Sequence, residues 1–230
     1  MLFILAVIFV TAALFFAVRS AMAAIWKLKP AMILDLLSLH VDLIVVVVLL
    51  FDFYVHWFYY KDMRVTSAMS QYTLYVFCLG SGLYIYSMID LVGMGRSSEI
   101  YHHIVFLSVM SLIVFKVEMR IFLFSYMALQ NMTGVIYHST RVIEKGKMSS
   151  IKGVLINISF HIVFRMILPL IYITLFIVSF MHLPLIARIV MSPVLAVNYS
   201  LNTYWFIAMI KILQRKMMRK TSSNKVAVIK

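Results

Sequence analysis

Three ionisable side chains lie near one another in the segment SMIDLVGMGRSSEIYHHIVF, residues 87–106: Asp90, His102 and His103. The sequence on either side of this segment is almost entirely apolar. A buried neutral imidazole can transfer a proton or activate a nucleophile, with the second histidine or Asp90 fixing its tautomer. These three residues are therefore candidate catalytic groups. The alternative interpretation is a polar helix start at a membrane interface, with no chemical role.

Other reactions of histidine need patterns that this chain lacks. Adjacent residues on a helix point about 100° apart, so His102 and His103 do not face one metal ion as an i, i+4 pair would. The sequence contains no HExxH motif, no zinc-type cysteine and histidine spacing, and no second histidine box of the kind that di-iron membrane enzymes need. A GxSxG elbow is also absent. We expect no metal and no bound cofactor.

The elements that position these residues are predicted to be transmembrane helices. The chain is 64% hydrophobic and only 13% charged, whereas soluble domains carry about 25% charged residues. Runs of about 20 apolar residues are typical of membrane spans. The predicted fold is an all-α, multi-pass transmembrane helical bundle with about seven spans, in a range of six to eight. Their approximate ranges are 2–18, 32–58, 71–94, 101–117, 121–138, 154–180 and 185–210.

The distribution of basic residues predicts the orientation. The net charge is +13, and basic residues gather in the linkers 19–30 and 139–153 and at the C-terminal end. By the positive-inside rule, the N-terminus lies outside or in a lumen and the C-terminus lies in the cytosol. We divide the chain into a first span with its basic loop (1–30), a transmembrane domain (31–215) and a basic cytosolic tail (216–230). Residues 2–18 lack a basic start, which favours an uncleaved span over a signal peptide.

The positive charge does not indicate a nucleic-acid-binding protein. Of the 21 basic residues, seven lie in the last twenty positions, directly after an apolar run: Lys211, Arg215, Lys216, Arg219, Lys220, Lys225 and Lys230. A basic tail next to a membrane span is typical of contact with anionic lipid head groups. Membrane lipids and their fatty acyl chains are therefore the expected partners.

The second apolar segment carries a polar stripe. At about 100° per residue, five of its polar groups share a face about 100° wide, while His40 lies off it; the five are Asp35, Ser38, Asp42, Asp52 and His56. Ionisable groups at membrane depth normally face the bundle interior, because exposure to lipid is costly. Either this face packs against other helices, or it lines a polar cavity. Asp35, Ser38 and Asp42 are candidate ligand-binding residues.

Arg165 is predicted to lie in the middle of a span, in the segment HIVFRMILP. A permanently charged guanidinium at that depth requires a carboxylate partner. Asp90 and the carboxylates of the second segment are available, and the sequence does not choose among them. Pro169, four residues later, is expected to kink the helix.

Several short motifs occur in a fixed order between residues 31 and 215: SLH at 38–40, GLYIYSMID ending at Asp90, YHH at 101–103, LQNMTGVIYHSTRVI at 129–143, FRMILP at 164–169 and LNTYWFIAMIKIL at 201–213. This series resembles the TLC-domain family, the multi-pass proteins grouped with the ceramide synthases and translocating-chain-associated membrane protein. The resemblance implies a membrane bundle of the endoplasmic reticulum that acts in lipid metabolism. It also implies that the histidine pair is the functional centre.

The chain departs from the ceramide synthases within these motifs. Of the long motif that begins with the synthases' histidine pair, only His102, His103 and Arg120 match. In the element similar to Glu-x-Ser-Thr-Pro-Phe, Gln130 replaces the acid and Thr133 remains. Arg120, Thr133 and Arg165 are therefore further candidate ligand-binding residues. No acidic residue lies between Glu118 and Glu144, where the synthases carry paired aspartates. The sequence therefore resembles the smaller TLC-domain proteins more than the synthases.

Three functions remain open. The first is a lipid-handling protein with an acyl-lipid-binding cavity, active in lipid metabolism, lipid sensing or control of membrane composition. The second is an acyl-CoA-dependent N-acyltransferase that acts on a sphingoid base, in which His102 or His103 is the base or acyl acceptor and Arg120 holds a phosphate of acyl-CoA. The third is a non-enzymatic trafficking or partner-binding protein of the endoplasmic reticulum.

Overall fold

The computed structural model describes residues 2–55, 71–95, 97–114, 120–145, 148–179, 181 and 185–228, and every long element within these ranges is a helix. In chain order they are α1 (Leu2–Trp26), α2 (Pro30–Val55), α3 (Gln71–Gly93), α4 (Ser97–Val114), α5 (Arg120–Ile143), α6 (Ile151–His161), the π-helical segment η2 (Ile162–Ile167), α7 (Leu168–Ser179) and α8 (Leu185–Val228). Because α6, η2 and α7 follow one another without a break, the described residues form seven helical rods.

Four stretches of the described residues are long and apolar enough to cross a membrane: Phe3–Trp26, Pro30–Asp52, Thr73–Gly93 and Ile151–Val178. The all-α prediction is confirmed for the described residues, and these four stretches are compatible with a membrane protein. The seven rods fall on the seven predicted segments. A total of about seven membrane crossings stays a prediction.

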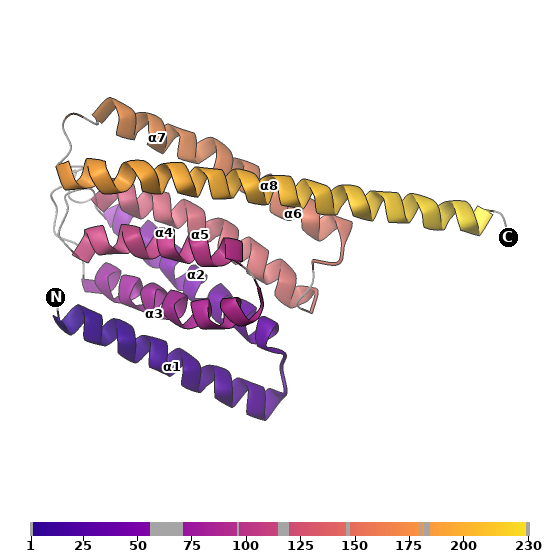
Figure 1. The fold of residues 1–230 in the computed structure, drawn as a ribbon, viewed down its shortest axis with the longest axis horizontal. Coiled ribbons are helices and arrows are strands. Elements are labelled where there is room, and N and C mark those ends of the chain that lie inside the picture. Colours follow the sequence, from indigo (N-terminus) through magenta and orange to yellow (C-terminus); the bar gives the residue numbers. More distant parts are fainter. Residues whose placement is uncertain are drawn as a thin grey trace.

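The rods run roughly alongside one another in a bundle (Figure 1). The first helix, α1, lies at one edge and packs mainly on α3, while α2 packs most extensively on α5. α8 contacts α4 and α6 and then continues well past the end of the bundle (Figure 1). Fully buried apolar side chains come chiefly from α2 and α3, among them Ile33, Leu49, Leu83, Tyr86 and Leu91. Interlocking of such side chains holds helices together where no water is available to drive burial.

A small residue brings α1 and α3 into close contact. Gly82 on α3 lies against Thr11 on α1, and a Cβ at position 82 would collide with the Thr11 side chain. The Thr11 hydroxyl also donates to the carbonyl of Cys78 at 3.3 Å. Close backbone approach at a small residue is typical of helix pairs in membranes.

The first helix extends beyond the predicted range of 2–18 to Trp26, because arginine is a good helix former and Arg19 does not end the helix. The Nε of Arg19 donates to Asp90 on α3 at 3.0 Å. The chain then leaves the helix at Lys27, whose φ of 51° is left-handed. Pro30 starts α2, at a position where its missing N–H is not needed.

A π-helical turn lies directly before Pro169. Within η2 the hydrogen bonding widens, and the N–H of Leu168 donates to the carbonyl of Val163. Since proline has no N–H, Pro169 leaves the carbonyl of Arg165 without its usual helical donor. The side-chain amide of Asn202 on α8 lies 3.4 Å from that carbonyl and donates to it. This hydrogen bond therefore links the rod that contains Pro169 to α8.

Candidate functional site

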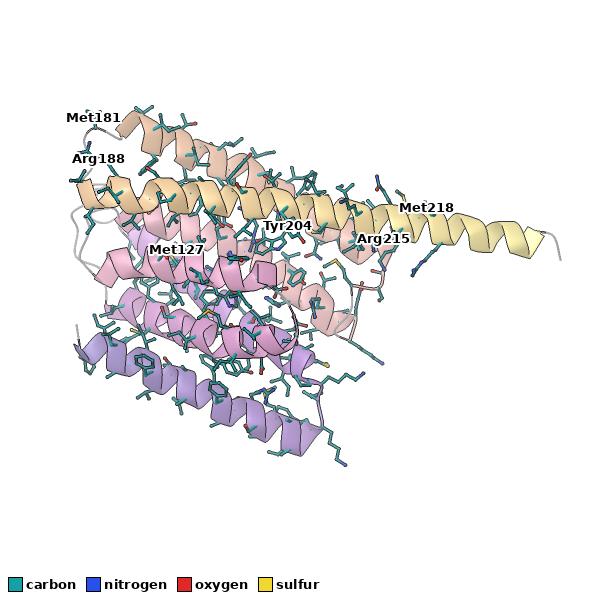
Figure 2. All side chains as sticks on the ribbon, in the orientation of Figure 1. Met127, Met181, Arg188, Tyr204, Arg215 and Met218 are labelled. Carbon is teal, nitrogen blue, oxygen red and sulfur yellow. The ribbon has the colours of Figure 1, made fainter. Side chains whose placement is uncertain are left out.

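A cavity of about 460 Å³ lies inside the bundle, lined by residues of every helix except α1 and α7. Its volume is in the range typical of sites for small organic ligands. Met127 on α5 and Tyr204 on α8 belong to its lining, whereas Met218 lies on the part of α8 that projects from the bundle (Figure 2). The lining combines apolar side chains with an unusual number of polar and ionisable ones.

Arg165 is the buried cation of the cavity, with only 8% of its surface exposed. Its three nitrogens donate to neutral groups: the Thr133 hydroxyl, the side chain of Asn202 at 3.4 Å and the backbone carbonyl of Gln130 at 3.1 Å. Its guanidinium also lies 5.1 Å from the centre of the Trp205 ring. No carboxylate lies within 4 Å of the Arg165 guanidinium among the described residues, but Asp42 of α2, one of the predicted partners, is near enough to interact with it electrostatically.

Three buried polar atoms of the cavity lining have no hydrogen-bond partner among the described residues. They are Nδ1 of His102, Nε2 of Gln130 and Oδ1 of Asn198. Gln130 and Asn198 are each more than nine-tenths buried. A buried polar atom without a partner costs about 1–3 kcal/mol. In native structures, buried polar atoms of this kind are usually met by ordered water or by a ligand.

The two histidines of α4 have different surroundings. His103 meets the Ser87 hydroxyl on α3 through its Nδ1 at 3.0 Å and lies against the ring of Tyr84, with 4.4 Å between ring centres. His102 contacts the Trp205 ring on α8, with 5.2 Å between ring centres. Ser87 therefore contacts Nδ1 of His103, where Asp90 or His102 had been predicted. Both imidazoles line the cavity.

Asp42 is a buried carboxylate of the same cavity. Its side chain lies directly against Gly134 on α5, in the space that a Cβ at position 134 would occupy. One Asp42 oxygen is 4.0 Å from Nε2 of His138, and Nδ1 of the same imidazole is 2.9 Å from Asp35. His138 thus lies between two carboxylates of α2.

Asp35 is bound just outside the cavity. Its second oxygen accepts from Nε of Arg141 at 2.9 Å, and Arg141 also donates to the Tyr137 hydroxyl at 2.8 Å. The Asp35 side chain is 1% exposed. This ion pair joins α2 to α5 beside the cavity, since Arg141, Tyr137 and His138 all belong to the lining.

The structure brings six of the nine predicted site residues to the cavity: Ser38, Asp42, His102, His103, Thr133 and Arg165. Asp35 binds lining residues without being one of them. Asp90 lies elsewhere, bound to Arg19 and to the Tyr86 hydroxyl at 2.9 Å. Arg120 begins α5, and its side chain is outside the described part of the chain.

Sequence reasoning missed several polar residues of the lining. On α5 they are Gln130, Tyr137, His138 and Arg141, and on α8 they are Asn198 and Trp205. A signal was present, because Gln130, Thr133, Tyr137 and Arg141 follow the three- and four-residue spacing of one helix face. A helical wheel of residues 121–143 would have found this second polar stripe.

The loop between α5 and α6 is organised by Glu144. Its carboxylate accepts from the backbone N–H and hydroxyl groups of Ser149 and Ser150, and the Ser150 hydroxyl caps α6 by accepting from Gly153 at 2.8 Å. Slight burial favours the neutral acid, but the hydrogen bonds from Ser150 and Ser149 outweigh it and lower the pKa of Glu144. Lys216 of α8 donates to the carbonyl of Ser149 at 2.6 Å, so α8 is attached to this loop.

Within the described ranges, no group of three histidine, cysteine or acidic side chains is placed to hold a metal ion. Comparison with known proteins gives no match: no family model, no curated protein and no solved structure matches the chain. The TLC-domain resemblance therefore stays a prediction from the motifs.

Proposed function

We propose that this chain is a multi-pass membrane protein that binds an acyl lipid in the cavity between its helices. The observation that carries the proposal is the set of three unpartnered buried polar atoms around a cavity of about 460 Å³. The cavity also has apolar lining from Leu34, Val105, Met127 and Val194. A mixed lining of this kind suits an amphiphile, whose polar head meets the polar atoms while its chain lies along the apolar side chains. Control of lipid metabolism or membrane composition is the role that fits such binding.

A space-filling substitution tests this proposal. Ala208 lies in the cavity lining on α8, whereas Ala196 on the same helix is exposed on the outer surface. Ala208→Phe would fill part of the cavity, and Ala196→Phe is the matched control. The protein would be purified in mild detergent, and its bound lipids extracted and measured by mass spectrometry.

We expect stoichiometric acyl lipid with the wild type and with Ala196→Phe, and a several-fold loss with Ala208→Phe. Equal lipid in both variants would place the bound lipid on the outer surface and contradict the proposal. An empty wild-type protein, still folded and able to take up no added lipid, would also contradict it.

A second candidate is N-acyl transfer from acyl-CoA to a sphingoid base. The specific observation in its favour is that both histidines line the cavity, with Ser87 bound to Nδ1 of His103. In this reaction a histidine takes a proton from the amine as the nitrogen attacks the thioester carbonyl. The C–S bond then breaks, and the thiolate of CoA takes up a proton as it leaves.

The purified protein would be incubated with acyl-CoA and a labelled sphingoid base. Formation of N-acylated product that is lost in the His102→Ala/His103→Ala double variant would support catalysis. Bound acyl lipid without turnover would leave the first proposal and remove the second.

A further inference from the structure

We propose that the polar end of the cavity binds an anion, and that the ligand is a single-chain amphiphile with a carboxylate or phosphate head seated on Arg165. This inference rests on the lipid-binding function proposed above and specifies its ligand.

Arg19, Arg141 and Arg165 differ in the charge of their hydrogen-bond partners. Arg19 is ion-paired with Asp90, and Arg141 is ion-paired with Asp35. Arg165 is buried deeply, and its three hydrogen bonds go to neutral acceptors beside an aromatic ring, while the Asp42 carboxylate acts on it electrostatically from beyond ion-pair distance. A guanidinium carries five N–H donors, and the three hydrogen bonds of Arg165 leave two of them available. A buried cation in this state is stabilised most by an anion that approaches from the cavity.

The neighbouring unpartnered atoms supply further donors. Gln130 accepts from Arg165 through its backbone carbonyl, and its side-chain oxygen lies 3.5 Å from the Asn202 amide. Its Nε2 group therefore remains as an unpartnered donor beside the guanidinium. The unpartnered Nδ1 of His102 is a donor when it carries the imidazole proton. These donors complement the oxygens of a carboxylate or phosphate.

Three lining groups do not favour an anion, and each has another partner. The Glu99 carboxylate interacts with the Arg141 guanidinium. The Asp42 carboxylate faces His138 at 4.0 Å, which lies between it and Asp35. Asn198 presents an amide oxygen, but its amide nitrogen lies 2.5 Å from the Tyr126 hydroxyl. Rotation of that amide by half a turn would let Tyr126 donate to the oxygen and would point the N–H₂ group into the cavity.

The size of the cavity favours one acyl chain. About 460 Å³ accommodates a single-chain amphiphile, whereas a phospholipid with two chains would lie largely outside it. Apolar lining continues toward Met148, Met209 and Ile212, at the end of the cavity near the α5–α6 loop. The head would bind at Arg165, and the chain would extend along these residues.

The test compares four probes of matched chain length on the purified full-length protein: palmitate, hexadecanol, hexadecylamine and 1-palmitoyl lysophosphatidate. Binding would be measured by displacement of a fluorescent fatty acid and by the shift in thermal unfolding. We expect palmitate or lysophosphatidate to bind at least about tenfold more tightly than hexadecanol, as charge-assisted hydrogen bonds imply. The stronger of these two identifies the head as carboxylate or phosphate.

Arg165→Gln would reduce the preference for the anion to about the level of hexadecanol, and Arg165→Lys would restore part of it. Arg215→Gln is the matched control, because Arg215 is exposed on α8 and does not belong to the lining. This control removes the same charge without touching the site. Should Arg165→Gln fail to fold, the comparison of palmitate with hexadecanol on the wild type still decides the question.

The outcomes separate the two proposals. If no probe binds the folded wild type, the lipid-binding function itself is wrong. If palmitate, lysophosphatidate and hexadecanol bind equally, or if Arg165→Gln keeps the full preference, the cavity binds lipid but the anion site is wrong. If hexadecylamine binds most tightly and Asp42→Asn abolishes that binding, the head group is a cation and this inference is overturned.

Discussion

Arg141 and Arg165 are buried guanidinium groups that stabilise the bundle in different ways. Arg141 is held by the carboxylate of Asp35, and the pair fastens α2 to α5. Arg165 is held by neutral groups of α5 and α8 and keeps donor capacity for the cavity. Charges in apolar surroundings are costly unless they are matched, so the first pair is a structural contact and the second arginine is suited to binding.

The Asp35 pair predicts a stability effect. Asp35→Asn would leave Arg141 buried without its counter-charge and weaken the contact to His138, at a cost of about 3 kcal/mol. The expected result is a clear drop in the thermal unfolding midpoint in detergent. Asp90→Asn is the comparison, because its partner Arg19 is 30% exposed and water screens that pair. Equal losses in both variants would contradict the structural role assigned to Asp35.

Gly134 predicts an overpacking effect. Gly134→Ala would place a methyl group where the Asp42 carboxylate lies, so the side chain or the helix must move. We expect a loss of about 1–3 kcal/mol and a change in ligand affinity. Gly93→Ala is the matched control, because nothing lies within 4 Å of a Cβ built there. Unfolding midpoints of the two variants and the wild type check this prediction.

At the residue scale, the sequence predicted which polar groups turn inward but not what they meet. The helical wheel placed Asp35, Ser38 and Asp42 on one face, and the structure buries both carboxylates and leaves His40 exposed. Partner choice was not predictable, because Arg19 and Asp90 are 71 positions apart and belong to different helices. The neutral hydrogen-bond acceptors of Arg165 come from α5 and α8, so they depend on how three helices pack, which no local pattern encodes.

At the scale of elements, the π-helical turn and Pro169 create a place where α8 is hydrogen-bonded to the continuous helix α6–η2–α7. Asn202 serves both, since its amide approaches the Arg165 carbonyl and its own carbonyl accepts from His161 at 2.8 Å. Asn202 is fully buried. A single side chain thus compensates for the hydrogen bond that Pro169 removes.

Asn202→Leu is therefore expected to destabilise the protein by about 1–3 kcal/mol, because it leaves a buried carbonyl and part of the Arg165 guanidinium without partners. Thr203→Val provides the control on the neighbouring residue, whose hydroxyl bonds only to Tyr199 in its own helix. Denaturant titration in detergent would measure both. An unchanged Asn202→Leu protein would show that the η2 carbonyl has another donor.

The α5–α6 loop predicts a pH dependence. Hydrogen bonds lower the pKa of Glu144 in the folded protein below its ordinary value of 4.5. The stabilisation is then fully present above about pH 4.5 and is lost as the pH falls through the lower folded pKa. Glu144→Gln should be less stable than the wild type at pH 7, by under about 1 kcal/mol at this exposed site. The difference should shrink in unfolding curves recorded below pH 4.5; a constant difference would contradict it.

Element positions were predicted well from apolar runs, and element ends less well. The segment 71–94 corresponds to α3 within one residue. The range 2–18 stopped too early, because Arg19 was treated as an end signal although arginine is a good helix former. Apart from Pro169, nothing in the sequence predicts the π-helical turn. Its hydrogen-bonding pattern depends on a donor from the neighbouring helix, which a local sequence pattern does not show.

At the scale of the whole molecule, the two chain ends lie at opposite ends of the bundle (Figure 1). The basic linkers near α1–α2 and α5–α6 lie at the end from which α8 emerges (Figure 1). This arrangement agrees with the charge-based orientation, in which these linkers share one side. Residence in the endoplasmic reticulum with a cytosolic C-terminus remains our proposal.

Protease protection tests that orientation. In sealed microsomes, an epitope at the C-terminus should be digested by added protease, while an N-terminal epitope should survive until detergent is added. An N-terminal glycosylation tag should also be modified. Both epitopes on the same side would indicate an even number of crossings and contradict the prediction of seven.

α8 has one further consequence. Trp205 lies in the cavity wall, and the helix continues from there to Val228, a length of about 35 Å at about 1.5 Å per residue. The Lys216–Ser149 contact lies about halfway along this length. If α8 tilts by about 5° about that contact, Val228, about 18 Å away, moves by about 1.6 Å. Under the proposed function, a ligand that moves Trp205 should therefore also move the far end of α8.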